Sequence, residues 1–253
     1  MTEIDRQRFA SMAEAYDAMA PYLLPQYAFL QEEMLRLAEL DALAHPIVVD
    51  LGAGSGRFLE RVLERNARAT CYWMDSSHDF CGVARRRLAR FDERVVFIES
   101  ALEDAWEADV DGPVHAIFSM SAIHHLESDD KRRLYRRCFD LLVPGGWFVN
   151  TDEMQTMYRD AYLASLHHWV RHVDDSREVI PADLLESYEQ WQGHFDRWKK
   201  RNIEQADAPK TKGDDLHEGF IEQMTWLSQI GFENVDVFVK HHLWCSVGGR
   251  KPA

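Results

Sequence analysis

The chain has 253 residues, 46% of them hydrophobic and 28% charged, and it carries a formal net charge of −14 at pH 7. This composition is typical of a globular protein that is large enough to bury a substantial core. The acidic balance argues against a general binder of phosphate backbones, and there is no run of about 18 apolar residues to predict a membrane span. The polar, acidic N-terminal segment lacks the pattern of a signal peptide, so we expect a cytoplasmic protein.

The first part of the chain predicts helices, and an alternation of strands and helices follows it. Residues 5–40 have helical character, with a break predicted around Pro21 and Pro25. Short apolar runs rich in β-forming residues then alternate with helix-like stretches, which is typical of a parallel sheet covered on both faces. The predicted strands are 46–51, 69–75, 94–100, 114–120 and 146–151, and the predicted helices are 57–67, 78–91 and 128–142.

The remainder of the chain predicts further helices and a closing pair of strands. Residues 155–230 are helical in character, and the charged stretch 207–215 predicts a flexible break within them. Near the C-terminal end, two apolar runs flank a polar Lys-His-His segment at 240–242. This pattern predicts a final antiparallel pair.

The stretch VVDLGAGSGRF places an acid at the end of the first predicted strand and glycines at 52, 54 and 56 behind it. A strand, a glycine turn and a helix N-terminus form a ligand-binding crevice in open α/β sheets. Glycine suits this turn because a Cβ atom would block the close approach of a ligand to the backbone. Arg57 stands where a dinucleotide fingerprint has its third glycine, and there is no G-K-S/T sequence to indicate a P-loop.

The pattern D-x-G-x-G-x-G from Asp50 to Gly56 resembles motif I of the class I S-adenosylmethionine-dependent methyltransferases. Asp75 closes the second predicted strand, where an acid can bind both hydroxyls of a ribose. The segments YWMDSSHDFCGVARRRL, AIFSMSAIHHLESDDK, LLVPGGWFVNTDE and QIGFENVDVF resemble later motifs of the same family. The resemblance covers residues 45–150 and 226–250. It implies a Rossmann-like α/β fold with a seven-stranded, mostly parallel sheet whose last strand is antiparallel.

The resemblance also implies S-adenosylmethionine as the cofactor and S-adenosylhomocysteine as its product. It places Asp50 near the methionyl amino group, Gly52 and Gly54 under the methionyl moiety and Asp75 on the ribose. Tyr16 matches a Tyr-Asp pair that is frequent ahead of the first strand in this family, where the ring can approach the sulfonium. The predicted cofactor-binding set is Tyr16, Asp50, Gly52, Ala53, Gly54, Gly56, Asp75, Ser76, Ala101, Leu102 and Ser119.

The adenine contact departs from the family pattern. Members of the family commonly have an acid after the third strand that binds the adenine amino group, and here Ala101 occupies that position. Glu103 and Asp104 are alternative side-chain partners. The backbone of Ala101 and Leu102 is a further alternative.

The acceptor chemistry points to histidine. Methyl transfer to oxygen or nitrogen often needs a base with a pKa near neutrality, which favours an imidazole. His124 and His125 follow the fourth predicted strand and stand beside the expected cofactor, so we predict them as the catalytic residues; the alternative is that this turn only packs. A metal is a second possibility. Its candidate ligands lack a dedicated spacing such as H-E-x-x-H, so no metal site is predicted. They are Asp152, Glu153, His167, His168, His172, His241 and His242.

The resemblance divides the chain into a core and two additions. Residues 45–153 and 226–253 are the expected cofactor-binding core, and 1–44 are N-terminal helices. A minimal class I methyltransferase has one helix between its fifth and sixth strands, whereas here 154–225 intervene. This insertion is rich in aromatic residues, and we expect it to form a helical lid over an acceptor pocket together with the N-terminal helices.

We therefore predict a methyltransferase that modifies an oxygen, nitrogen or sulfur atom of a small, apolar or aromatic molecule. We expect a monomer or homodimer without a membrane partner, and we interpret the basic clusters at 84–90, 131–137 and 199–201 as solvated helix faces rather than a nucleic-acid site. Three alternatives stay open: a tRNA-directed enzyme of this fold, a cofactor-modifying enzyme of the carboxy-SAM type, and a non-catalytic cofactor-binding module. An NAD-dependent oxidoreductase is the weakest alternative because the third glycine is displaced.

Overall fold

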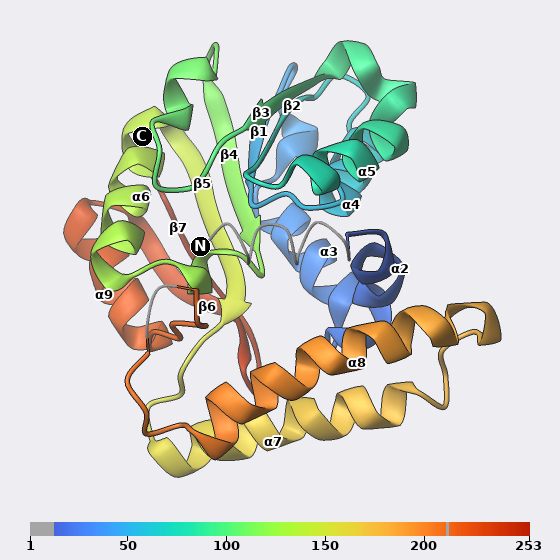
Figure 1. Cartoon of the computed structure of the whole chain (residues 1–253). Coiled ribbons are helices and arrows are strands. Elements are labelled where there is room, and N and C mark those ends of the chain that lie inside the picture. Colours follow the sequence, from blue (N-terminus) through green and yellow to red (C-terminus); the bar gives the residue numbers. More distant parts are fainter. Residues whose placement is uncertain (1–12, 211–212) are drawn as a thin grey trace.

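The computed structural model of the protein describes residues 13–210 and 213–253. One sheet forms its centre (Figure 1). The strands are β1 (Ile47–Leu51), β2 (Thr70–Asp75), β3 (Val95–Glu99), β4 (Val114–Met120), β5 (Leu142–Glu153), β6 (Glu233–His241) and β7 (Trp244–Arg250). Their order is β3-β2-β1-β4-β5-β7-β6, in which β1 to β5 are parallel and β7 is antiparallel to both neighbours. This confirms the predicted α/β fold with its antiparallel last strand.

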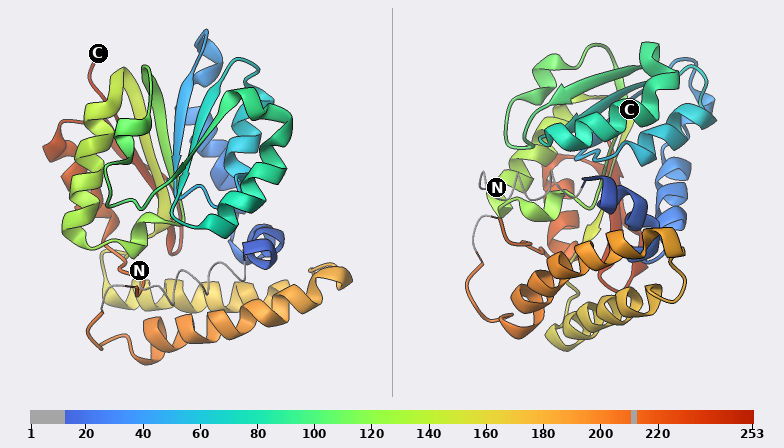
Figure 2. Two further views of the ribbon diagram at one scale, coloured as in Figure 1. Left: turned by 45° about the horizontal axis from the view of Figure 1, so that its top comes forward. Right: turned by 45° about the vertical axis from the view of Figure 1, so that its right-hand side comes forward.

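Helices cover both faces of the sheet (Figure 2). Side chains alternate along each strand, so Val48 of β1 packs into one core and Val49 into the other. The first core includes apolar residues of α3 (Tyr27–Leu37), α4 (Arg57–Arg65) and α5 (His78–Leu88). The second includes those of α6 (Ser128–Leu141) and α9 (Phe220–Ile230). Neither of these two cores covers the carboxyl ends of the parallel strands, where a third layer of helices lies.

That third layer consists of α2 (Ala13–Leu23), α7 (Arg159–Ser176) and α8 (Leu185–Lys199). The pair α7 and α8 lies across one end of the sheet rather than on either face (Figures 1 and 2). A separate hydrophobic core joins the three helices. Within it, the rings of Trp169 and Trp198 lie 4.4 Å apart, and Phe195 stacks on Trp198 at 5.3 Å. These aromatic residues of the insertion are core residues, not the lining of an open pocket.

Several predicted boundaries are wrong in detail. Pro21 lies inside α2 instead of breaking it, because a proline in the last turn leaves most of the helical hydrogen bonds intact. The break comes at 24–26, which confirms the prediction at Pro25, and Gln26 has a left-handed φ of 61°. Strand β5 begins at Leu142, ahead of the predicted residue 146. The part of the predicted helical region before residue 13 lies outside the described residues.

The predicted break at 207–215 separates α8, with its π-helical extension Lys200–Glu204, from α9. Its described end is held in place: Arg201 Nε donates to Asp214 Oδ1 at 2.8 Å, and Asn202 Nδ2 donates to Asp215 Oδ2 at 2.9 Å. The antiparallel pair β6 and β7 confirms the predicted closing strands. Within residues 13–210 and 213–253, no helix is long and apolar enough to cross a membrane.

Candidate active site

The glycine turn after β1 lies at the carboxyl edge of the sheet, where the strand order changes direction between β1 and β4. Gly52, Gly54 and Gly56 all have positive φ, at 67°, 51° and 77°. A Cβ atom on Gly52 would lie 2.2 Å from the Cβ of Ala122, and one on Gly56 would lie 3.0 Å from a Leu88 methyl group. Beside Gly54 the nearest atom would be 4.0 Å away. The expectation that all three glycines make room for a ligand is therefore corrected: Gly52 and Gly56 make room for protein neighbours, and only Gly54 faces open space.

Two carboxylates flank this turn. Asp50 is buried, and no described residue donates a hydrogen bond to its Oδ2. Burial and the nearby charge of Asp75 raise the pKa of Asp50 well above 3.8. Asp75 accepts hydrogen bonds from the backbone N–H groups of Gly54 and Ser77, each at 2.9 Å, although burial still raises its pKa. A cationic or hydrogen-bond-donating ligand would stabilise the ionised form of these two carboxyl groups and lower their pKa values.

The other predicted cofactor residues have mixed surroundings. Ser119 is fully buried, and its hydroxyl donates to the carbonyl of Leu51 at 2.8 Å, so it joins β4 to β1 underneath the turn. The carbonyl of Leu102 accepts a hydrogen bond from Arg137. The remaining members of the set in this region, Ala53, Ser76 and Ala101, are partly buried.

His124 is the centre of a buried charge cluster beyond β4. Its Nδ1 lies 2.5 Å from Asp152 Oδ1, its backbone N–H donates to Asp152 Oδ2 at 2.9 Å, and its Nε2 lies 3.5 Å from Asp215 Oδ1. Burial alone would lower the pKa of His124, but the two carboxylates outweigh it and raise that pKa well above 6.5. The same contact outweighs burial and lowers the pKa of Asp152. His124 is therefore an imidazolium that donates a proton on each side.

His125 has the opposite character. Its Nδ1 lies 3.4 Å from Asp215 Oδ1, and its ring centre lies 4.0 Å from that of His124. Burial and the positive charge of His124 lower the pKa of His125. Its side chain is still 34% exposed. A pKa of about 3 keeps the His125 ring uncharged at pH 7, but it also makes the ring a weaker base than an imidazole whose pKa is near neutrality. The ligand atoms of His124, His125 and Asp215 lie within 4.8 Å of one another.

A second pair of buried groups lies beside His124. The Nε2 atom of His217 lies 2.9 Å from Glu153 Oε2, and the Nδ1 atom of His217 lies 2.6 Å from the hydroxyl of Tyr162. The ring centres of His124 and His217 are 5.8 Å apart. Tyr162 belongs to α7, so this pair joins the end of β5 to the third layer.

Tyr16 of α2 lies between the glycine turn and this cluster. Its ring packs edge-on against Phe80, with centres 5.9 Å apart, and Phe80 is the side chain nearest to the open side of Gly54. Its hydroxyl is hydrogen-bonded to the side chain of Ser121, and burial and Tyr27 raise its pKa. The structure thus brings the predicted Tyr16, Asp50, Gly54 and Asp75 to the same edge as His124 and His125.

Sequence reasoning missed Asp215, His217 and Ser121. Asp215 and His217 lie in the run DDLHE at 214–218; Asp215 is the last residue of the predicted flexible break at 207–215, and His217 follows that break. The density of acids and histidine in that run was the available signal. Ser121 has a φ of 58°, which its sequence context does not reveal.

Comparison with known proteins identifies the domain. Residues 48–146 match the family model of the methyltransferase domain. No curated protein matches at a significant level.

Solved structures share the fold. An O-methyltransferase family protein from Burkholderia thailandensis has a TM-score of 0.57 at 18% identity, over 88% of this chain and 57% of that one. An O-methyltransferase from Nostoc punctiforme, described as putative, has a TM-score of 0.58 at 17% identity, over 97% of this chain and 60% of that one. Human N-acetylserotonin methyltransferase, solved in complex with SAM, has a TM-score of 0.51 at 13% identity, over 100% of this chain and 68% of that one. The chain thus spans less than two thirds of the length of the two bacterial proteins. The match shows that residues 48–146 form a methyltransferase domain, and the strand order and the solved structures show that the chain has the α/β fold of S-adenosylmethionine-dependent methyltransferases.

Proposed function

We propose that the protein transfers a methyl group from S-adenosylmethionine to an oxygen, nitrogen or sulfur atom of a small, apolar or aromatic molecule, with His125 as the general base. One observation carries this proposal. The partly exposed side chain of His125 lies beside the buried pair of His124 and Asp152, at the edge of the sheet that also holds the glycine turn.

The residues around the glycine turn fit the cofactor. The buried Oδ2 of Asp50 has no hydrogen-bond donor among the described residues and suits the cationic amino group of the methionyl moiety. Gly54 leaves space for a ligand, and Asp75 suits ribose hydroxyls. When bound, the cofactor supplies an electrophilic methyl group.

The protein's own residues would position the acceptor and remove its proton. Methyl transfer is an in-line displacement, so catalysis depends on holding the acceptor atom about 3 Å from the methyl carbon and on excluding water. His125 is the candidate base of the two because its ring is uncharged, whereas the contacts of His124 with two carboxylates favour its protonated form. His124 would act as a positioning residue that holds Asp152 and Asp215 in place.

The charge distribution favours a small acceptor over a nucleic acid. In the basic cluster at 84–90, Arg86 pairs with Glu14, Arg87 with Asp17 and Glu60, and Arg90 with Glu60 and Glu64. Arginines that are neutralised by carboxylates offer little to a phosphate backbone. The helices of the third layer, which lie across the carboxyl edge, would keep water from a small molecule.

Calorimetry with S-adenosylhomocysteine tests the cofactor half of the proposal. We expect saturable binding to the wild type, at least tenfold weaker binding to Asp75→Ala, and no binding of NAD. Equal affinities of wild type and Asp75→Ala would contradict the assigned ribose contact. Binding of NAD instead would contradict the family function as a whole.

Turnover against a panel of phenols, amines and thiols tests the acceptor half. We expect His125→Ala to lower kcat by about 10²- to 10⁴-fold, the usual contribution of a general base, without changing the affinity for S-adenosylhomocysteine. Turnover of His125→Ala within a few-fold of the wild type would show that His125 is not the base.

A further inference from the structure

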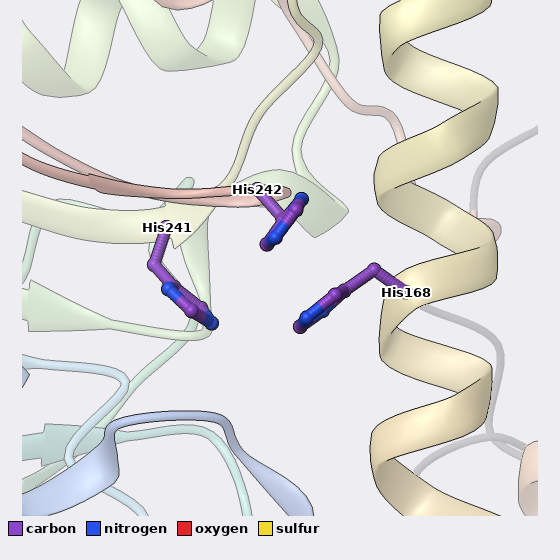
Figure 3. Close-up of side chains that lie close together, drawn as sticks. All are labelled: His168, His241 and His242. Atoms are coloured by element: carbon purple, nitrogen blue, oxygen red, sulfur yellow. The ribbon is translucent and has the colours of Figure 1, made fainter.

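A cluster of three imidazoles lies outside the candidate active site. His168 comes from α7, His241 from the end of β6 and His242 from the turn that follows it (Figure 3). One nitrogen atom from each ring lies within 4.8 Å of the other two. The rings of His168 and His242 are stacked, with centres 3.6 Å apart, and His241 lies edge-on to both, at 5.3 Å and 5.0 Å.

The nitrogen atoms of this three-histidine cluster are not all used by the protein. His168 Nδ1 is buried, and no described residue provides a hydrogen-bond partner for it. A buried polar atom without a partner is costly, so it marks a place where a ligand would be stabilising. By contrast, His172, one turn further along α7, already donates from Nε2 to the carbonyl of Tyr22 at 2.9 Å. His168 and His172 are therefore not the helical ligand pair that their spacing allows.

The donor set selects a class of metal. Three imidazoles without a carboxylate suit Zn²⁺, Ni²⁺ or Cu²⁺ rather than Mg²⁺ or Ca²⁺, which prefer oxygen ligands. In a tetrahedral zinc site with bonds of about 2.0–2.1 Å, donor atoms lie about 3.4 Å apart. The three nitrogen atoms lie within 4.8 Å of one another, so each pair needs to close by at most about 1.4 Å, through side-chain rotations on an exposed turn and a helix face.

We propose that His168, His241 and His242 bind one divalent transition-metal ion of the zinc type, which fastens helix α7 to the β6–β7 turn. Three protein ligands leave one coordination position for water or for a donor atom of a bound molecule. The ion would link α7 of the third layer to the sheet, because its ligands come from both α7 and the β6–β7 turn.

The location gives this link a consequence. His241 pairs with Trp244 of β7, and Trp244 pairs with Glu153 of β5, so the cluster lies at the same edge of the sheet as the candidate active site. Two strand spacings, about 10 Å in total, separate the His241 and Glu153 backbones. A metal here would fix the position of α7 relative to the sheet at the edge that holds the candidate active site, without contacting His124 or His125.

Zinc titration against a chromogenic chelator, on protein first stripped with EDTA, tests the proposal. We expect one equivalent of Zn²⁺ per wild-type chain and a rise in Tm on binding. His168→Gln and His242→Asn should each weaken binding at least tenfold and abolish the rise in Tm. Asparagine is chosen at 242 because it tolerates the left-handed backbone, where φ is 54°.

His167→Gln is the matched control, since His167 is exposed on the same helix next to His168. It should bind Zn²⁺ as the wild type does. A full equivalent of Zn²⁺ retained by His168→Gln, equal losses in His167→Gln and His168→Gln, or no saturable binding by the wild type would each overturn the proposal. Because His242 lies on an exposed turn, we expect His242→Asn to stay folded. An unchanged circular dichroism spectrum would then show that its loss of Zn²⁺ binding does not come from unfolding.

Discussion

Asp152 and Asp215 hold His124 from two sides, and this arrangement decides which of the adjacent histidines can act as a base. Both ring nitrogens of His124 face carboxylate oxygens, so both must carry protons. The resulting positive charge adds to burial in keeping His125 neutral. The sequence prediction named both histidines as catalytic, and their surroundings give them different protonation states.

Replacing His124 should destabilise the protein in a pH-dependent way. His124→Gln leaves Asp152 buried without its cationic partner, so we expect the free energy of unfolding to fall by about 3 kcal/mol at pH 6. The folded-state pKa of His124 is raised above 6.5, so its contribution is complete below about pH 6.5 and is lost as the pH rises through the raised value. The pKa of Asp152 is lowered, so its contribution is present above about pH 3.8 and is lost as the pH falls through the lowered value.

Urea denaturation at pH 6 and pH 9 measures this effect. The wild type should lose stability between the two values, and His124→Gln should lose less. Equal losses in both proteins would contradict the assigned ion pair.

At the scale of single elements, the turn between β1 and α4 shows how one motif serves two purposes. Its positive φ values need glycine at all three positions, but only Gly54 has open space beside it. Gly52 lets Ala122, which follows β4, approach the turn. The motif therefore packs two loops together at the same time as it shapes a ligand site.

We expect Gly52→Ala to lower the free energy of unfolding by about 3 kcal/mol, because the new Cβ would lie 2.2 Å from that of Ala122 and the backbone would be strained. Gly193→Ala is the control within a helix: it lies on the exposed face of α8, with no atom within 4 Å of the new Cβ. It should raise stability by about 0.5–1 kcal/mol. Urea denaturation of both variants checks the pair, and a cost below about 1 kcal/mol for Gly52→Ala would contradict the packing argument.

At the scale of the whole molecule, α2 connects the third layer to the sheet domain. On one side, Asp17 pairs with Arg57 of α4 at 2.7 Å and with Arg87 of α5 at 2.6 Å. On the other side, the carbonyl of Leu23 accepts a hydrogen bond from Trp169 of α7 at 2.9 Å. Because α2 also carries Tyr16, which packs against Phe80 beside the glycine turn, its position links that turn to the third layer.

Asp17→Ala should loosen this connection. The half-buried Asp17 accepts charged hydrogen bonds from two arginines, so we expect its loss to lower the free energy of unfolding by about 2 kcal/mol. Hydrogen exchange should become faster in α2 and stay unchanged in β1. Glu14→Ala is the control on the same helix, since its pair with Arg86 is exposed and should contribute less than about 0.5 kcal/mol. Equal effects of the two variants would contradict a connecting role for Asp17.

Much of the fold was predictable because its signals are local. Apolar runs, helical periodicity and the glycine turn lie within short stretches, so β1 to β4 and the helices between them were predicted to within a few residues. The glycine pattern and Asp75 are likewise local signals, and they indicate a methyltransferase domain. The acceptor side was predicted only in part, because its residues come from loops that are distant in sequence.

The sequence by itself determined the α/β sheet, the glycine turn with its acids and the family of the domain, since turn chemistry and side-chain periodicity act over a few residues. Only the tertiary structure decided which groups meet across the carboxyl edge. It joined Asp152 and Asp215 to His124, packed Tyr16 against Phe80 beside the turn, and brought His168 to His241 and His242. Protonation and metal affinity depend on burial and on distances of a few ångströms between chain segments, and the order of residues along the chain does not contain these distances.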